Sequence, residues 1–450
     1  MNSLVKLMLP DVIELLAEGS ETEIAEAFGK FHAADIAEVL AELEDEPGVK
    51  LLLALAGEQQ IETFEHLEHH DQVRLARSAG PERMAPIVAK MAPDDRADFV
   101  GALPPTMTSG VIKRLPIAER KVQDLLAVYD EETAGGIMTS EYVALRPDMT
   151  VQQAIDHVRK VAAERETIYA LYVIDTGKLV GVVTMRQLIL EDPQRLIRDV
   201  MIEDPIAMPP NVDQESVVEQ LGHYDFVAMP IVDAKGQMLG IVTHDDVLDV
   251  AVEEATEDAQ MMGGLEPLED TYMATALLTL VRKRATWLTV LFIAGLGAGS
   301  VLRHFQNTLQ HTVTLIFFLP LIIASGGNSG SQSATLVTRG LATGDVDLTD
   351  WFRIVRRELA SGMMLGCLLG GLGCVASAFL GVPNWQRVAA TVWLTLIAIV
   401  TCGSLLGSLL PIGLKRVGLD PAITSAPLVS GLIDIVGIWI YVHVANAVMP

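Results

Sequence analysis

Long uncharged stretches in the C-terminal part of this 450-residue chain leave it few folds to adopt. Crossing the hydrocarbon core of a bilayer takes about 20 predominantly apolar residues in a helix, and buried helices of a water-soluble protein rarely repeat at such length. Four of the stretches contain no charged residue and the fifth contains only Asp434: 285–302, 304–338, 359–386, 388–414 and 421–450. The sequence therefore predicts a transmembrane domain of five helices over residues 285–450.

The rest of the chain is strongly acidic. Residues 1–259 hold 49 of the 58 Asp and Glu but only 21 of the 32 Lys and Arg, a formal net charge of −28, whereas residues 260–450 carry +2. A polyanionic surface repels nucleic-acid phosphates and attracts cations. We therefore expect divalent cations, and no nucleic acid, as partners. The chain has no nucleophile elbow, phosphate loop or zinc-protease motif, so we predict that it is not an enzyme.

Basic residues beside the predicted helices indicate how the chain is oriented in the membrane. The opposite side holds only Arg303 and Arg387, while nine lie on the N-terminal side: Arg282, Lys283, Arg284, Arg339, Arg353, Arg356, Arg357, Lys415 and Arg416. This distribution places the N-terminal half in the cytosol and, with five helices, the C-terminus outside the cell (inner) membrane. Residues 1–10 lack an apolar core long enough for a cleaved signal, so the first helix is expected to direct insertion. The three cysteines all fall inside predicted helices and provide neither a disulfide framework nor a thiolate metal site.

Residues 1–130 are expected to form an acidic helical domain. Three similar amphipathic segments, 34–40, 71–76 and 94–100, each begin with an acidic or small polar residue near the helix start, where the helix dipole favours it. Repeated short helices of this kind indicate a small α-solenoid. An ordinary helical bundle fits the same pattern equally well.

Residues 131–256 alternate short β-like and helical segments and contain an internal duplication. Segment 173–184 recurs as 231–243, and each copy reads as a strand, a glycine-containing turn and a second strand, ending at Thr184 or Thr243 where a helix should begin. The unit resembles the cystathionine-β-synthase (CBS) domain, with a first copy over 131–199 and a second over 200–256. This resemblance implies a regulatory module without catalysis that often binds adenine nucleotides, so ATP is a candidate ligand of the pair.

The order of these parts resembles the MgtE family of magnesium channels and transporters. Three segments carry the resemblance: 131–139, which leads into the first CBS copy, 326–335 in the second membrane helix and 427–434 in the fifth. Ser331 stands where members often carry Asn, and Ser430 where a small apolar residue is common; neither departure removes a charge. The family implies a solenoid-like helical domain, an α/β CBS pair, a connecting helix over 257–284 that acts as a plug, and an all-α domain of five membrane helices.

Asp434 is the only acidic residue within any predicted membrane helix. A charge at this depth costs roughly 3 kcal/mol and needs a partner or a water-filled path, and no basic residue within the helices can pair with it. We predict a cation site in which Ser430 and Asn328 supply neutral oxygens; a protonated Asp434 bonded to polar neighbours is the alternative. One carboxylate binds a divalent ion weakly, so a homodimer with Asp434 near its two-fold axis is attractive, and the family implies it. Gly326 and Gly327 mark either a helix interruption or a close helix approach.

The acidic half suggests how such a pore is controlled. Mg²⁺ bridging carboxylates would relieve self-repulsion and favour a compact, closed form when cytosolic Mg²⁺ is plentiful. Oxygen ligands without clustered His or Cys favour Mg²⁺ over Zn²⁺, and the pairs Asp94/Asp98 and Glu254/Asp258 each share one helix face. The family resemblance assigns regulatory metal binding to Glu62, Asp94, Asp98, Asp213, Glu215, Asp225, Asp246, Asp249, Glu254, Glu257 and Asp258.

The sequence thus predicts a Mg²⁺-selective channel or transporter for magnesium uptake, closed by cytosolic Mg²⁺ bound between the acidic helical domain and the CBS pair. An ion-coupled secondary transporter of Mg²⁺ or Co²⁺ is the main alternative. A nucleotide-responsive membrane sensor, in which the apolar helices only anchor the chain, is the second.

Overall fold

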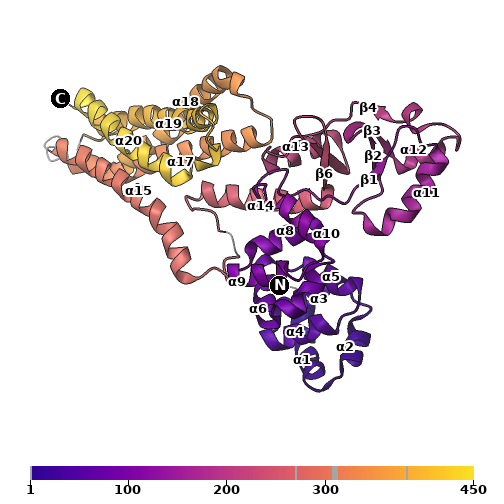
Figure 1. The fold of residues 1–450 in the computed structure, drawn as a ribbon. Coiled ribbons are helices and arrows are strands. Elements are labelled where there is room, and N and C mark those ends of the chain that lie inside the picture. The colour runs from indigo at the N-terminus through magenta and orange to yellow at the C-terminus, as the bar shows by residue number, and fades with distance from the viewer. Residues whose placement is uncertain (1–2, 269–270, 307–312, 382–383, 450) are drawn as a thin grey trace. The chain divides into compact units, whose positions relative to one another are not determined.

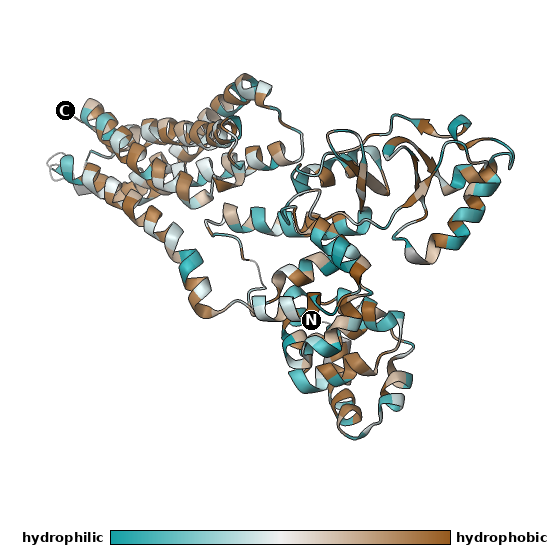
Figure 2. Ribbon diagram, viewed as in Figure 1, coloured by the Kyte–Doolittle hydropathy of each residue, from teal (hydrophilic) through white to brown (hydrophobic). Residues whose placement is uncertain are grey.

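The computed structural model describes residues 3–268, 271–306, 313–381 and 384–449 (Figure 1). The chain forms two compact units, Met1–Glu253 and Glu254–Pro450. Hydrophilic residues are frequent on the short helices of the first unit, and hydrophobic residues dominate the long helices of the second (Figure 2).

The first 126 residues form short helices that stack as a solenoid. Each odd-numbered helix packs on the next odd-numbered one from α1 to α9, and each even-numbered helix on the next even-numbered one from α2 to α10. This stacking confirms the helical domain and favours the solenoid over the bundle. The helices are α1 (Ser3–Glu18), α2 (Glu21–Phe28), α3 (Ala33–Glu42), α4 (Asp45–Ala54), α5 (Glu58–Glu65), α6 (His69–Ala79), α7 (Pro81–Val88), α8 (Pro93–Ala102), α9 (Pro105–Ile112) and α10 (Ile117–Leu126).

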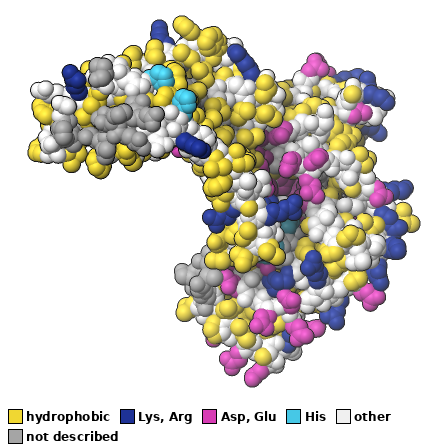
Figure 3. All heavy atoms as spheres, turned by 90° about the vertical axis from the view of Figure 1, so that its left-hand side faces the viewer, with side chains coloured by type: hydrophobic (Ala, Val, Ile, Leu, Met, Phe, Trp, Pro, Cys, Tyr) yellow, Lys and Arg dark blue, Asp and Glu magenta, His cyan; other side chains and the backbone are white. Residues whose placement is uncertain are grey.

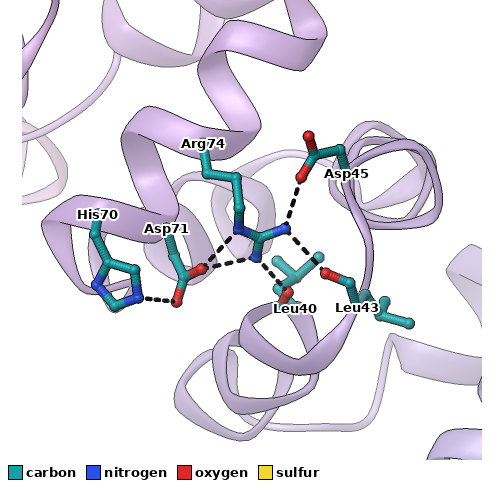
Figure 4. A network of polar contacts seen from close by, with 6 residues as sticks. All are labelled: Leu40, Leu43, Asp45, His70, Asp71 and Arg74. Atoms are coloured by element: carbon teal, nitrogen blue, oxygen red, sulfur yellow. Dashed lines mark hydrogen bonds and ion pairs between the residues drawn. The ribbon is translucent and has the colours of Figure 1, made fainter. Parts of the chain in front are cut away.

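The side chain of Arg74 joins helices of this solenoid through a network of polar contacts (Figure 4). The guanidinium of Arg74 on α6 donates to Asp71 Oδ1 at 2.7 Å and 2.9 Å, and also to the backbone carbonyls of Leu40 and Leu43. It reaches Asp45 on α4 at 3.1 Å. The Asp71 side chain is only 6% exposed, so Arg74 both neutralises a buried carboxylate and ties α6 to α3 and α4.

The CBS region shows the duplication that the sequence predicts. Each copy contains an antiparallel hairpin, β2–β3 or β5–β6, whose turn contains a glycine with positive φ, Gly177 (86°) or Gly236 (76°). Thr184 caps α12 through a capping box with Gln187, and Thr243 directly precedes α14. The elements are β1 (Val143–Leu145), α11 (Val151–Val161), β2 (Ala170–Asp175), β3 (Lys178–Thr184), α12 (Met185–Leu190), β4 (Ile202–Glu203), α13 (Gln214–Tyr224), β5 (Ala228–Val232), β6 (Met238–Thr243) and α14 (His244–Met262).

The second unit is built from long helices. Those that are long and apolar enough to cross a membrane are α15 (Leu277–His304), α18 (Trp351–Phe379), α19 (Trp385–Arg416) and α20 (Ala426–Val448). Helix α17 (Val313–Ala342) has 30 residues but carries the polar run 328–333. Many large hydrophobic side chains of these helices remain exposed, including Phe292, Leu368 and Phe379. Hydrophobic side chains are frequent on the face of the molecule drawn in Figure 3. These helices identify a multi-pass membrane protein, and five crossings remain a prediction.

Helix α19 lies at the centre of this unit and packs against α17, α18 and α20. Glycines allow the close contacts: a Cβ added at Gly403 or Gly407 would run into the carbonyl of Gly326 or Gly330 on α17. Helix α17 continues through Gly326 without interruption. Of the two roles predicted for Gly326 and Gly327, the structure therefore supports close approach.

Residues 257–284, in the second unit, differ from the single connecting helix that the sequence analysis expected there. Helix α14 ends at Met262, residues 263–268 are not helical, and α15 begins at Leu277. Gly264 has a φ of 74°, a conformation that an L side chain rarely adopts. The glycine pair at 263–264 thus explains why the helix ends where it does.

Candidate functional site

The two membrane signatures meet along the contact between α17 and α20. A Cβ at Gly327 would lie 3.0 Å from Ser430 Oγ, so the α17 backbone approaches this hydroxyl closely. Ser331 Oγ lies 3.4 Å from Ser430 Oγ and donates to the carbonyl of Ala426 at 3.0 Å. Ser331 and Ser430, the two departures from the family pattern, therefore contact each other.

Asp434 follows Ser430 by one turn of α20 and is half-buried. Among the described residues its carboxylate makes no hydrogen bond and no ion pair. The predicted cation site and the alternative of a protonated Asp434 bonded to neighbouring polar groups therefore both stay predictions. Asn328, next to Gly327 on α17, is exposed, and its amide is available as a neutral oxygen donor. Asp434, Ser430 and Asn328 thus lie on the two helices that meet here.

A second acidic side chain lies inside a long helix. Helix α18 begins at Trp351, two turns before the uncharged stretch, and so includes Glu358. Ser333 on α17 donates to Glu358 Oε2 at 2.7 Å. The sequence did not single out Glu358, because it lies one residue outside the uncharged run.

The first unit brings acids of the solenoid together with acids of both CBS copies. Asp94, Asp95 and Asp98 on α8 interact electrostatically with Asp246 at the start of α14, and Asp94 and Asp95 also with Glu166 of the first CBS copy. Asp94 is 6% exposed, and its Oδ1 has no hydrogen-bond partner in the described part of the chain. Such a buried, unpaired carboxylate is costly unless a cation neutralises it.

The pKa values of these carboxyl groups are all raised, and burial is the largest cause in each case. Burial and the neighbouring Asp246 hold the pKa of Asp94 well above its usual range. The pKa of Asp95 rises to about 8, with Glu65 and Asp246 adding to the effect of burial. The pKa of Asp98 and that of Glu166 rise to about 7, and that of Asp246 to about 6. Compact packing of α8 on the CBS pair therefore opposes ionisation of the cluster.

The structure brings together three predicted ligands, Asp94, Asp98 and Asp246, and adds members that the sequence analysis missed. Asp95 adjoins Asp94, and Glu65, Glu141 and Glu166 also interact with the cluster. The sequence analysis paired Asp94 with Asp98 and passed over Asp95, although Asp95 is three residues from Asp98 on the same helix. Glu166 lies in an irregular segment before β2 and has no sequence signal that links it to α8.

The other predicted ligands occupy separate positions. Glu62 lies on α5 beside Glu65, and Asp249 beside Asp246 on α14. Asp213 caps the start of α13, where its Oδ1 accepts from the backbone N–H of Glu215, and Asp225 ends that helix in a left-handed conformation. Glu254, Glu257 and Asp258 lie on the later part of α14, in the second unit.

Among the described residues, no three His, Cys, Asp or Glu side chains converge closely enough to hold a bare metal ion. Mg²⁺ dehydrates reluctantly and usually keeps several of its waters. The donor set, carboxylates of low exposure without a nearby sulfur ligand, fits a hydrated Mg²⁺ bound through its water shell. The orphaned Asp94 Oδ1 is the acceptor best placed for such a contact.

Arg96 is a buried cation beside this cluster. It is 1% exposed, lies 3.2 Å from Glu119 on α10 and donates to the Met91 carbonyl at 3.3 Å. Its Nε and Nη2 have no partner in the described part of the chain. Arg96 therefore joins α8 to α10 and holds the acidic helix in place.

Within the second unit, the segment after α14 is attached to α20. Gly264 packs against the Trp287 indole of α15 and lies near Pro427. Trp287 Nε1 donates at 3.1 Å to Ser425 Oγ, and this hydroxyl also caps α20 by accepting from Leu428 N–H. Burial, together with the nearby Asp420, raises the pKa of Asp258. The start of the helix that carries Asp434 is thus in contact with the connecting segment.

An acidic helical domain, a CBS pair and long apolar helices with a polar seam define a multi-pass membrane protein that carries a regulatory module. Family models agree: a divalent cation transporter model (MgtE) matches residues 319–444, the MgtE intracellular N domain matches 31–132, and the CBS domain matches 134–192 and 197–253. The chain is 35% identical to the magnesium transporter MgtE of Thermus thermophilus, with 97% of both chains covered. It belongs to the MgtE family.

Two further comparisons agree with this assignment. The magnesium transporter MgtE of Bacillus subtilis is 30% identical, with 97% of this chain and 96% of the relative covered. The crystal structure of the cytosolic domain of the Mg²⁺ channel MgtE in complex with ATP matches with a TM-score of 0.52 and 34% identity, and it covers 54% of this chain and 99% of that one. The resemblance predicted from the sequence is confirmed.

Proposed function

We propose that this chain carries Mg²⁺ into the cell through a homodimeric pore in the cell membrane, with the N-terminus in the cytosol and the C-terminus outside. The observation that carries the proposal is Asp434, a carboxylate on an apolar helix without a hydrogen-bond partner among the described residues. An ionised group at membrane depth requires a cation or water. The names of the relatives, magnesium transporters in Thermus thermophilus and Bacillus subtilis, support Mg²⁺ as that cation.

In this proposal, Asp434 of each subunit attracts the hydrated ion, and the hydroxyl of Ser430 and the amide of Asn328 accept hydrogen bonds from its waters. Binding through the water shell suits Mg²⁺, which exchanges its waters reluctantly. Two carboxylates across a two-fold axis supply the charge that one lacks. The close packing of Gly327 on Ser430 keeps the two helices in register at this point.

Regulation follows from the acidic cluster on α8 and α14. Mg²⁺ bound among Asp94, Asp95, Asp98, Glu166 and Asp246 would neutralise carboxylates that burial otherwise keeps from ionising. The ion binds the compact form more tightly than the separated one, and this difference shifts the equilibrium toward closure. Scarce Mg²⁺ would leave the charges to repel each other and the two parts to separate.

The contact of Gly264 with Trp287 gives the regulatory module a route to the pore. Movement of α14 would displace Gly264 and, through it, the Trp287 indole that it contacts. The hydrogen bond from Trp287 to Ser425 would then shift the start of α20. Nucleotide binding by the CBS pair is a further part of the proposal, and the related cytosolic domain in complex with ATP supports it.

The decisive experiment compares Mg²⁺ flux into vesicles containing the reconstituted wild type, Asp434→Asn or Asp434→Ala, with Asp345→Asn as a charge-matched control in an exposed loop. Both Asp434 variants should lose flux and fail to support magnesium-dependent growth, whereas the control should keep both. Tolerance of both Asp434 variants would indicate a membrane sensor instead. Flux that saturates and requires a proton or sodium gradient would indicate an ion-coupled carrier.

A further inference from the structure

A pocket of about 670 Å³ opens in the first unit between the end of the solenoid and the segment that leads into the CBS pair. Helices α8, α9 and α10 supply most of its wall, and Tyr129, Glu131 and Gly136 complete it. Small-molecule sites typically have volumes of this order.

The wall of the pocket is negatively charged. Asp98, Asp124 and Glu131 line it, and Lys113 is the one basic residue among its lining residues. Glu131 lies against α8, because a Cβ added at Gly101 would meet Glu131 Oε1 at 2.8 Å. Three carboxylates on different segments thus surround the space, and an anionic ligand is disfavoured.

A buried amide supplies a second, independent signal. Gln123 lines the pocket and is 3% exposed, and its Oε1 has no hydrogen-bond partner within the described part of the chain. An unpaired buried acceptor of this kind costs about 1–3 kcal/mol. A ligand that donates an N–H or O–H to Gln123 would remove this cost.

The remaining wall is apolar and aromatic. Val100, Leu103 and Leu126 are buried at the pocket, and the ring of Tyr129 packs on Gly135, where an added Cβ would lie 2.6 Å from it. Aromatic faces attract ammonium groups, and methylene chains cover apolar surface while their charged ends remain solvated. A hydrated metal ion, which uses only oxygen ligands, would leave these surfaces uncovered.

We propose that this pocket binds a linear organic polyamine, a chain of ammonium groups separated by short methylene segments. The ammonium groups pair with Asp98, Asp124 and Glu131 and donate to Gln123 Oε1, and the methylene segments cover the apolar wall. The site is separate from the proposed pore, and its occupancy does not depend on transport.

The test is calorimetric titration of spermidine into the full-length, detergent-solubilised protein in EDTA. Saturable binding of one spermidine per chain is expected. Glu131→Gln and Gln123→Leu should each weaken binding about tenfold, the loss expected for one hydrogen bond to a charged group. Glu38→Gln on α3 removes the same charge at an exposed position outside the pocket, and it should leave the affinity unchanged.

Two results would overturn the proposal: binding that does not saturate, or equal weakening by Glu131→Gln and Glu38→Gln, since either indicates diffuse attraction to a polyanion. Glu131 is exposed, so its variant provides this test even where Gln123→Leu fails to fold. Asp95→Asn lies outside the pocket lining. It should weaken the response to Mg²⁺ and leave spermidine affinity unchanged: Asp98 belongs to both sets of carboxylates, whereas Asp95 belongs only to the Mg²⁺ cluster, so this variant distinguishes the two proposals.

Discussion

Protons should replace Mg²⁺ in holding α8 on the CBS pair. Each carboxyl of the cluster has a raised pKa in the compact form, so this form binds protons more tightly than the separated form. Stability of the compact form is therefore complete below the ordinary Asp pKa of 3.8, falls as the pH rises above it, and is fully lost above about 8, the raised pKa of Asp95.

The free energy by which ionisation disfavours the compact form can be worked out for Asp95. Its pKa rises from 3.8 to about 8, and each unit corresponds to about 1.4 kcal/mol, so ionised Asp95 disfavours the compact form by about 6 kcal/mol. One ion held at about 100 times its dissociation constant contributes only about 2.7 kcal/mol. A single ion at that concentration therefore offsets only part of the cost of ionising Asp95 at alkaline pH.

Fluorescence energy transfer between two attached dyes measures whether the helical domain and the CBS pair are packed together or separated. The dyes are attached at Glu38→Cys on α3 and Lys160→Cys on α11, in a chain whose native cysteines, Cys367, Cys374 and Cys402, are replaced by serine. In EDTA, transfer should be high at acidic pH and fall as the pH rises from about 4 to about 8; saturating Mg²⁺ should restore it at alkaline pH.

Asp95→Asn should flatten the pH dependence of this signal, and Asp35→Asn, on the exposed side of α3, should leave it unchanged. Transfer that is independent of pH in EDTA, or that rises as the pH rises, would refute the reasoning. It would mean that burial of these carboxyl groups does not limit closure.

Three further changes test packing and coupling. Arg74→Met removes the guanidinium from the buried Asp71, which keeps only its 3.3 Å contact with His70 Nε2, and should lower the free energy of unfolding of the first unit by about 3 kcal/mol in urea titrations; the exposed Arg77→Met should cost little. Gly403→Ala places a methyl against an α17 carbonyl and should lower the free energy of unfolding of the membrane domain by about 1–3 kcal/mol. In Gly371→Ala the added methyl meets open space, so the free energy of unfolding should not change. Trp287→Phe removes the hydrogen bond to the α20 cap and should raise the Mg²⁺ concentration that halves flux, while the maximal flux persists; an unchanged inhibition curve would contradict the coupling route.

Much of the architecture was predictable because it follows from local periodicity and composition. Uncharged stretches identified the membrane helices, and the repeated glycine turns at Gly177 and Gly236 identified the CBS hairpins. Asp434 was recognisable as a candidate site because an ionised carboxylate in an apolar membrane helix costs free energy unless a cation or water stabilises it. Each of these signals lies within one segment of the chain.

Other features depended on which distant segments pack together. The choice between solenoid and bundle, the contact of Ser331 with Ser430, the approach of Glu166 to α8 and the unpaired oxygen of Gln123 were decided by tertiary structure. Asp95 reads in the sequence as one more solvated surface acid, and only its burial beside Asp246 perturbs its pKa. The spacing of residues along a helix shows which side chains share a face. Whether those side chains are buried or paired depends on which other segments pack against that face in the folded protein.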